Sequence, residues 1–115
     1  MRSAFRAPGD FAGFTLAPGA RARALFGERA MVNLVEMEPD AEVAMHSHPH
    51  EQLGVILRGS MTMTIGGEVG QVGELGGYVI APDVEHGGRA GPAGALVLDV
   101  FAPVREDYRT ASGEA

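Results

Sequence analysis

Three of the four histidines in this chain fall within positions 46–50, and the fourth stands alone at position 86. Side chains at positions i and i+2 of a strand share one face, so His46 and His48 can direct two imidazoles at one point. Neutral imidazole is the commonest metal ligand among protein side chains and suits divalent transition metals. The spacing therefore predicts metal chemistry at this pair.

A second candidate group lies at the end of the last apolar run, Ala95 to Phe101. One parity of this run is wholly aliphatic, and the other carries Asp99 and Phe101, which we expect to point into a cavity. A carboxylate in such a strand is costly unless it is functional or paired, for instance in a salt bridge near the strand end. Arg105 follows closely. Its planar guanidinium could clamp a substrate carboxylate, or could be an ordinary surface charge.

Period-two alternation, typical of β-strands, organises most of the chain. Seventeen glycines and seven prolines separate the runs at short intervals, which indicates a β-sandwich or a small barrel. Gly66 and Gly67 predict a two-residue hairpin turn. The unbroken apolar run from Leu53 to Leu57 predicts a strand buried on both faces. The expected strands are 21–26, 30–38, 42–48, 52–58, 60–65, 68–72, 78–80 and 95–101.

A chain of 115 residues fits one domain. We expect an N-terminal arm or edge strand over residues 1–20, a barrel over 21–104, and a tail over 105–115 that forms one helical turn or frays. The net charge of −6 and the lack of a basic cluster disfavour a nucleic-acid partner. No segment matches a signal peptide or a membrane span and there is no cysteine, so we expect a cytoplasmic protein without disulfides.

Two motifs of this chain resemble those of the cupin family. The residues that match the first motif, with glutamine where glutamate is more usual, are His46, His48, Gln52 and Gly59. The run from Gly76 to His86 is similar to the second motif, Pro-x-Gly-x-x-His, with Ala81 and Asp83 at the proline and glycine positions. The resemblance implies an all-β protein, a single-domain cupin jelly-roll β-barrel, and the strands on both sides of the motifs fit that fold.

The resemblance also implies that one divalent metal is held inside the barrel by His46, His48, Gln52 and His86. Glu51 is the rival to Gln52 as fourth ligand, but its parity and its offset from Gly59 do not match the motif. The alternative is a cupin that has lost its metal and keeps these histidines as polar filling of the barrel. Buried neutral imidazoles without partners would then be costly.

Three imidazoles and an amide carry no charge, so a bound metal would keep its full 2+ charge and be a strong Lewis acid. This favours polarising a carbonyl or an enol over activating oxygen, while zinc, nickel, manganese and iron all remain open. His50 lies in the loop between the ligand candidates. It is a candidate substrate-binding or proton-transfer group at the cavity mouth, or an exposed loop residue.

Beside this ligand set, Asp99, Phe101 and Arg105 resemble the KdgF-type pectin-degradation cupins, which convert 4,5-unsaturated uronates to their linear keto form. That resemblance implies a metal-dependent enzyme of isomerase or lyase type acting on an anionic sugar acid. Asp99 and Arg105 would be catalytic, and Phe101 would bind substrate. The alternatives are an Fe(II) dioxygenase acting on a small diketone or thiol, a polyketide-cyclase-like enzyme, and a non-catalytic module that binds a metal or a sugar acid.

The chain carries more apolar surface than the interior of one small barrel needs. The excess comes from the run Leu53 to Leu57, the arm from Phe5 to Leu16, and the strand that contains Met61 and Met63. Cupins commonly pair through such surfaces, and two-fold dimers are the commonest oligomers. We therefore expect a homodimer.

Overall fold

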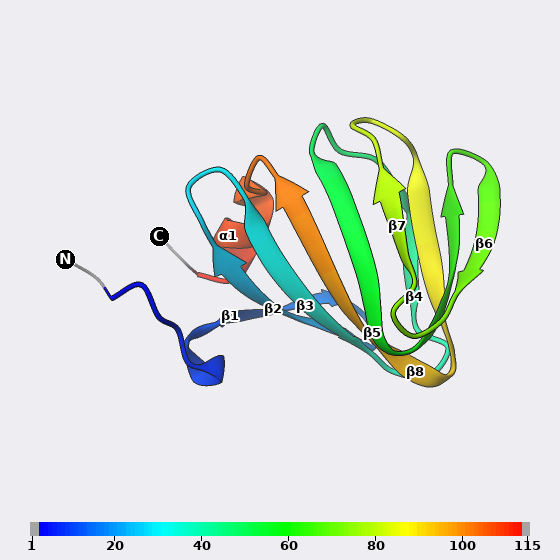
Figure 1. The fold of residues 1–115 in the computed structure, drawn as a ribbon, viewed down its shortest axis with the longest axis horizontal. Helices are drawn as coiled ribbons and strands as arrows, with labels where there is room; N and C mark the ends of the chain where they lie inside the picture. The colour runs from blue at the N-terminus through cyan, green and yellow to red at the C-terminus, as the bar shows by residue number, and fades with distance from the viewer. Residues whose placement is uncertain (1–2, 114–115) are drawn as a thin grey trace.

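Eight β-strands and two short helical segments make up the computed structural model, which describes residues 3–113. The strands form one antiparallel sheet that curls round an apolar interior (Figure 1), which confirms the expected all-β jelly roll. The strands are β1 (Ala12–Ala17), β2 (Ala20–Phe26), β3 (Met31–Met37), β4 (Glu42–His46), β5 (Glu51–Ile65), β6 (Glu68–Val72), β7 (Gly77–Ile80) and β8 (His86–Ala102). The helical segments are the 3-10 turn η1 (Pro8–Asp10) and the α-helix α1 (Glu106–Ala111).

Two long strands, β5 and β8, hold the sheet together. β8 pairs with β3 through residues 95–101 and with β4 through residues 86–89, while β5 runs along most of its length. The first half of β5 carries β7 at its other edge, and the second half carries β6. Residues far apart in the sequence therefore meet in rows across several strands, and these rows position the candidate site.

A β-bulge at Gly59 explains why residues 51–65 form one strand where the sequence predicted two. The pairing of β5 with β8 shifts on both sides of this glycine, whose φ is 77°. A Cβ at Gly59 would overlap the carbonyl group of Gly94, so glycine is needed for the close approach. The predicted hairpin at Gly66 and Gly67 is confirmed, and both residues have positive φ.

β8 begins at His86, well before Ala95, where the sequence predicted a strand. The segment 86–94 is rich in glycine and shows no apolar alternation, so its strand character is hidden in the sequence. The glycines leave room for core side chains. A Cβ at Gly88 would lie 2.5 Å from the sulfur of Met63, which fills the barrel at this point.

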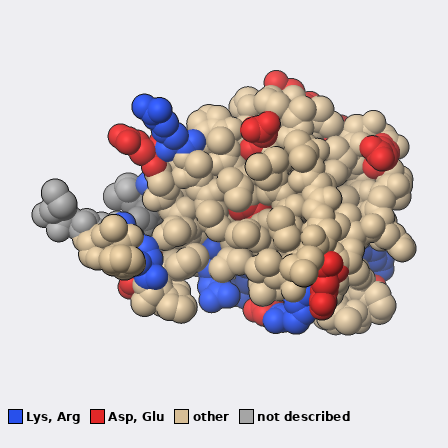
Figure 2. All heavy atoms as spheres, viewed as in Figure 1, with Lys and Arg blue, Asp and Glu red and all other residues tan. Residues whose placement is uncertain are grey.

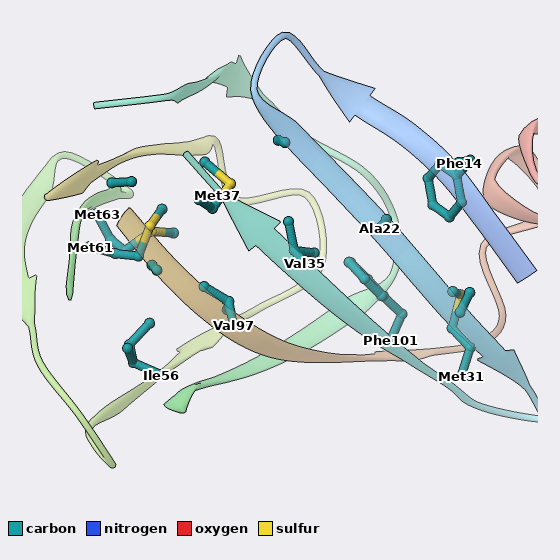
Figure 3. Close-up of a cluster of buried hydrophobic side chains, with 14 of the residues drawn as sticks. Phe14, Ala22, Met31, Val35, Met37, Ile56, Met61, Met63, Val97 and Phe101 are labelled. Carbon is teal, nitrogen blue, oxygen red and sulfur yellow. The ribbon is translucent and has the colours of Figure 1, made fainter. Parts of the chain in front are cut away.

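The core is filled mainly by methionine and branched aliphatic side chains of β3, β5 and β8, together with Phe14 and Phe101 (Figure 3). Met61 and Met63 are 5% and 6% exposed. They belong to this core, so the expectation that they supply spare apolar surface is wrong. The same holds for Phe14 of β1, which is buried against Tyr108 of α1.

The prediction that Leu53 to Leu57 is buried on both faces is also wrong. Burial alternates along β5: Ile56 is fully buried, whereas Leu53 and Leu57 are 42% and 39% exposed. An unbroken apolar run fits a strand buried on both faces, and it fits equally a strand whose outer face is apolar. The fold decides in favour of the second.

The first strand, β1, and the C-terminal helix, α1, both pack on the barrel, whereas the segment before β1 is mostly exposed. β1 is an edge strand paired with β2. The helix α1 places Tyr108 against Phe14 and Phe101, with ring centroids 5.0 Å and 5.6 Å apart, and so covers the interior beside the candidate site. Within residues 3–113, no helix is long and apolar enough to cross a membrane.

Candidate metal centre and cavity

The pairing of β4 with β8 brings three histidines together. His46 at the end of β4 is the register partner of His86 at the start of β8, and His48 follows just after β4. One ligand nitrogen from each residue lies within 4.8 Å of the others, so the three form a group that could hold a metal ion. The structure thus unites these histidines, which lie up to 40 positions apart in the sequence.

Each imidazole is oriented by a backbone carbonyl. Nδ1 of His46 and Nδ1 of His86 each lie 2.8 Å from the carbonyl oxygen two residues earlier. Nδ1 of His48 lies 3.1 Å from the carbonyl oxygen two residues later. Because a carbonyl oxygen can only accept a hydrogen bond, Nδ1 carries the proton and Nε2 keeps the lone pair of each neutral ring. All three rings therefore offer Nε2 as the ligand atom.

The surroundings keep the rings of His48 and His86 neutral. Burial lowers the pKa of both His48 and His86, and the positive charge of Arg105 lowers both further. Neutral imidazole, the form that binds metal, is thus favoured near pH 7. Nε2 of His86 is buried and has no hydrogen-bond partner among the described residues. Converging lone pairs, one of them without a partner, fit a divalent transition metal better than they fit packing histidines.

Gln52 joins this cluster from β5. Its side chain is buried, and its Oε1 lies 3.1 Å from Nε2 of His48. With the His48 proton on Nδ1, these two atoms are both acceptors, and a shared cation would satisfy both. The amide group of Gln52 also donates a hydrogen bond to Asp99. Glu51, the rival by sequence, is exposed and lies on the opposite face of β5.

Asp99 is the one acidic residue among the described residues that line the cavity beside this cluster. It is 8% exposed, and the Tyr78 hydroxyl donates a 2.7 Å hydrogen bond to its Oδ1. Burial raises the pKa of Asp99 to about 6, although hydrogen bonds from Tyr78 and Gln52 act in the opposite direction. A carboxyl group with this pKa can exchange a proton near neutral pH, as general acid–base catalysis requires.

One cavity is lined by His46, His86 and Asp99 together. Asp99 and Phe101 both face it, as strand parity indicated. The ring of Phe101 lies 5.6 Å from that of His48 and forms part of the apolar wall. The polar residues that line the cavity are Asn33, His46, Gln52, Tyr78, His86, Asp99 and Tyr108.

Arg105 lies beside the cavity rather than in its lining. It is 8% exposed, so the alternative of a solvated surface charge is wrong. Its guanidinium donates hydrogen bonds of 2.7 Å and 3.2 Å to Asp107 and of 2.8 Å to the Tyr108 hydroxyl. It also stacks on the Tyr108 ring, 3.8 Å from the centroid. A substrate carboxylate would have to displace Asp107 to reach it.

His50 lies in the loop after β4. Its carbonyl oxygen accepts the hydrogen bond from Nδ1 of His48, and the two rings are 5.4 Å apart. Its own Nδ1 is buried without a hydrogen-bond partner in the part of the chain that the structure describes. The ring does not contribute to the cavity lining. The structure thus gives His50 a supporting contact with His48, and a contact with substrate stays a prediction.

Three polar residues of the cavity were not recognised as site residues from the sequence: Asn33, Tyr78 and Tyr108. Asn33 is 1% exposed, is the register partner of Asp99, and has no hydrogen-bond partner for Oδ1 within residues 3–113. A signal for it existed, because Asn33 is the lone polar residue at the core positions of its strand. Tyr78 and Tyr108 gave no such signal, because their positions in the cavity depend on contacts between elements that are far apart in the sequence.

Residues 33–101 match the family model of the cupin domain, so the chain belongs to the cupin family. A comparison with curated proteins gave no match. An RmlC-like cupin from Shewanella frigidimarina is 23% identical, with a TM-score of 0.85 over 93% of this chain and 96% of that chain. KdgF from Halomonas sp. is 23% identical, with a TM-score of 0.84 over 93% and 99%.

Part of a larger protein also matches in fold. Oxalate decarboxylase from Bacillus subtilis, described with Mn(II) centres, is 23% identical, with a TM-score of 0.78 over 86% of this chain and 29% of that chain. At these identities the likeness shows the fold. The chain is therefore a small single-domain cupin, and its three-histidine group could bind a divalent metal.

Proposed function

We propose that the cavity is the active site of a metal-dependent enzyme that converts 4,5-unsaturated uronates to their linear keto forms. The observation that carries this proposal is the set of three histidines, each with Nδ1 on a backbone carbonyl, beside a buried carboxyl group. The resemblance of Asp99, Phe101 and Arg105 to the KdgF-type pattern supports the choice of substrate.

The metal ligands would be the three histidine Nε2 atoms and the Oε1 atom of Gln52. All four donors are neutral, so a bound divalent ion would supply strong Lewis acidity toward substrate oxygens. Zinc, nickel, manganese and iron all accept such a set. Glutamine suits this position because its amide donates to Asp99, whereas a glutamate would place a second carboxylate against it.

Asp99 would carry the proton in this reaction. The anomeric hydroxyl of the sugar loses a proton, the ring C–O bond at the anomeric carbon breaks, and the former ring oxygen becomes an enol oxygen. Protonation of the double-bond carbon then gives the ketone, so the reaction is an isomerisation without a co-substrate. Asp99 accepts the first proton and returns it to carbon. Phe101 would pack against the sugar ring. Arg105 would bind the carboxylate of the substrate after that carboxylate displaces Asp107.

Measurements on the metal-reconstituted protein separate this proposal from its alternatives. Loss of the unsaturated uronate without oxygen uptake supports the isomerase. Oxygen consumption with Fe(II) and a small diketone or thiol would instead support a dioxygenase. Saturable binding of the uronate without turnover would support a binding module.

Asn33 would bind a hydroxyl group of the substrate. Its buried Oδ1 lacks a hydrogen-bond partner among residues 3–113, and Asn33 is the register partner of Asp99, where the sugar would react. Asn33→Leu keeps the size of the side chain and removes the acceptor. We expect it to raise KM about 2- to 12-fold, with little change in kcat or metal content. Steady-state kinetics test this, and an unchanged KM would remove Asn33 from substrate binding.

We also propose that two copies pair through the outer face of β3, β8, β5 and β7. Figure 1 and Figure 2 show the same view, in which β3, β5 and β8 lie in the middle. The surface over these strands carries few charged side chains. Strand register groups the apolar residues of this face into two neighbouring rows, Val32, Val100, Leu53 and Val79, then Leu34, Leu98 and Val55. An exposed apolar patch of this kind typically marks an interface, and a two-fold dimer would cover it on both copies.

Val55→Lys is expected to convert this dimer into a monomer, because it places a charge within the proposed interface. The matched control is Val69→Lys on β6, which is 66% exposed and lies outside the two rows. The control should remain dimeric. Light scattering at micromolar concentration gives the answer, and a monomeric wild-type protein would contradict the pairing.

A further inference from the structure

Tyr78 contacts Asp99 across an intervening strand. Tyr78 lies on β7 and Asp99 on β8, and β5 runs between them. Gly54 of β5 is the register partner of both residues, so the three form one row across the inner face of the sheet. The phenol ring spans this row, and its hydroxyl donates a 2.7 Å hydrogen bond to Oδ1 of Asp99. The proposed reaction uses Asp99 and gives Tyr78 no task.

Gly54 makes this contact possible because it has no side chain. A Cβ at this position would overlap three atoms of Tyr78, including the hydroxyl oxygen. The backbone does not call for glycine here, since Gly54 is not among the residues with positive φ. The glycine therefore serves the tyrosine ring, which lies over the bare backbone of β5 and reaches the carboxyl group.

We propose that Tyr78, seated over Gly54, is a positioning residue that holds the Asp99 carboxyl group in one orientation for proton transfer. This inference rests on the proposed function for its catalytic consequence. A carboxyl group turns readily about its last side-chain torsion, so one fixed oxygen decides where the other one points. The Tyr78 hydroxyl fixes Oδ1, and the Gln52 amide supplies a second donor.

The hydroxyl is a dependable donor in this place. Burial and the neighbouring Asp99 raise the pKa of Tyr78, so the phenol stays protonated through the neutral range. Its ring packs against the hydrophobic core and lines the cavity. Hydrogen bonds to a charged group contribute about 1.5–3 kcal/mol, which corresponds to roughly 10- to 150-fold in a rate that depends on them.

The first test needs no substrate. The ¹³C carboxyl resonance of Asp99 is followed by NMR at one fixed pH in the metal-loaded wild type, Tyr78→Phe, Gly54→Ala and Gly70→Ala. Gly70 is a matched control, because a Cβ there meets no atom within 4 Å and its φ is not positive. We expect Tyr78→Phe and Gly54→Ala to shift the resonance in the same direction, and Gly70→Ala to leave it unchanged.

The second test measures turnover of the unsaturated uronate by the same four proteins. Tyr78→Phe and Gly54→Ala should each lower kcat about 10-fold or more with little change in KM or metal content. The double variant should be no slower than Gly54→Ala, because both changes remove the same hydrogen bond. A purely structural role would instead lower the melting temperature and leave kcat of the folded enzyme unchanged.

The two tests separate two failures. An unchanged Asp99 resonance in Tyr78→Phe would overturn the positioning role, whatever the substrate. Unchanged kcat in both folded variants would overturn it as well. If the Asp99 resonance shifts in both variants but the wild-type protein does not convert the uronate, the contact between Tyr78 and Asp99 is supported and the proposed activity is overturned.

Discussion

Asp99→Asn is expected to lower kcat by about 100- to 10,000-fold and to leave the metal content unchanged. Asparagine has the shape of aspartate, and its amide oxygen can still accept the hydrogen bond from Tyr78. It cannot take up and return a proton. The variant therefore removes the proton chemistry of Asp99 and keeps its size, while it loses one of the two acceptors that the Tyr78 hydroxyl and the Gln52 amide use.

Steady-state kinetics and metal analysis of the same preparation measure the two effects. Loss of activity together with loss of metal would mean that Asp99 acts through the ligand cluster. Full activity in Asp99→Asn would remove Asp99 from the mechanism.

The same variant should be more stable than the wild type above pH 6. Burial raises the pKa of Asp99 from 3.8 to about 6, so the native state resists ionisation that the unfolded chain allows. The wild type therefore loses stability as pH rises from about 4 to about 6, by about 3 kcal/mol once the carboxyl is ionised in both states. Asparagine does not titrate. The difference in melting temperature between the metal-free proteins should grow across this window, and a constant difference would contradict the raised pKa.

His86→Ala is expected to abolish metal binding at neutral pH and, with it, turnover. Changes in groups that merely support a ligand typically cost 10- to 100-fold in metal affinity, and loss of a ligand should cost at least that much. Nε2 of His86 is buried and has no hydrogen-bond partner among the described residues, so a bond to a metal ion would satisfy it. In the wild type, metal affinity should fall at acidic pH, because the imidazoles must be neutral to bind, and the lowered pKa of His48 and His86 moves this loss to more acidic pH.

His50→Ala is the matched control, since the His50 ring adjoins His48 but does not line the cavity. Its carbonyl, which holds His48, is retained in the variant. Metal stoichiometry after dialysis and circular dichroism should separate loss of the ligand from loss of the fold. A folded His86→Ala protein that keeps one metal per chain would contradict the assigned ligand set.

The sequence predicted most of the fold and the core of the site, because both depend on local spacing. Alternation marks strands, Gly66 and Gly67 mark a hairpin, and the step from His46 to His48 aims two rings at one point. Asp99 was recognised because a lone carboxylate in an apolar strand is energetically unfavourable to bury unless it is paired or functional. These signals can be read without knowing which strands are neighbours.

What the sequence could not show depends on strand register. Tyr78 reaches Asp99 because β7, β5 and β8 align with a glycine between them, and no local pattern encodes that alignment. The glycine-rich start of β8 was hidden because its partners are methionine side chains of another strand. The prediction that Leu53 to Leu57 is buried on both faces was wrong because, in the sequence, apolar residues on an outer face cannot be distinguished from buried ones.

In the proposed reaction, this cavity rearranges an unsaturated uronate with the help of a metal and Asp99. The most direct measurement mixes the metal-reconstituted protein with a 4,5-unsaturated uronate and follows the absorbance of its enol-ether double bond. The spontaneous rate, the metal-free protein and Asp99→Asn serve as controls. We expect the absorbance to disappear much faster than in every control, with a linear keto product by NMR. Decay at the spontaneous rate in the metal-loaded protein would contradict the proposal.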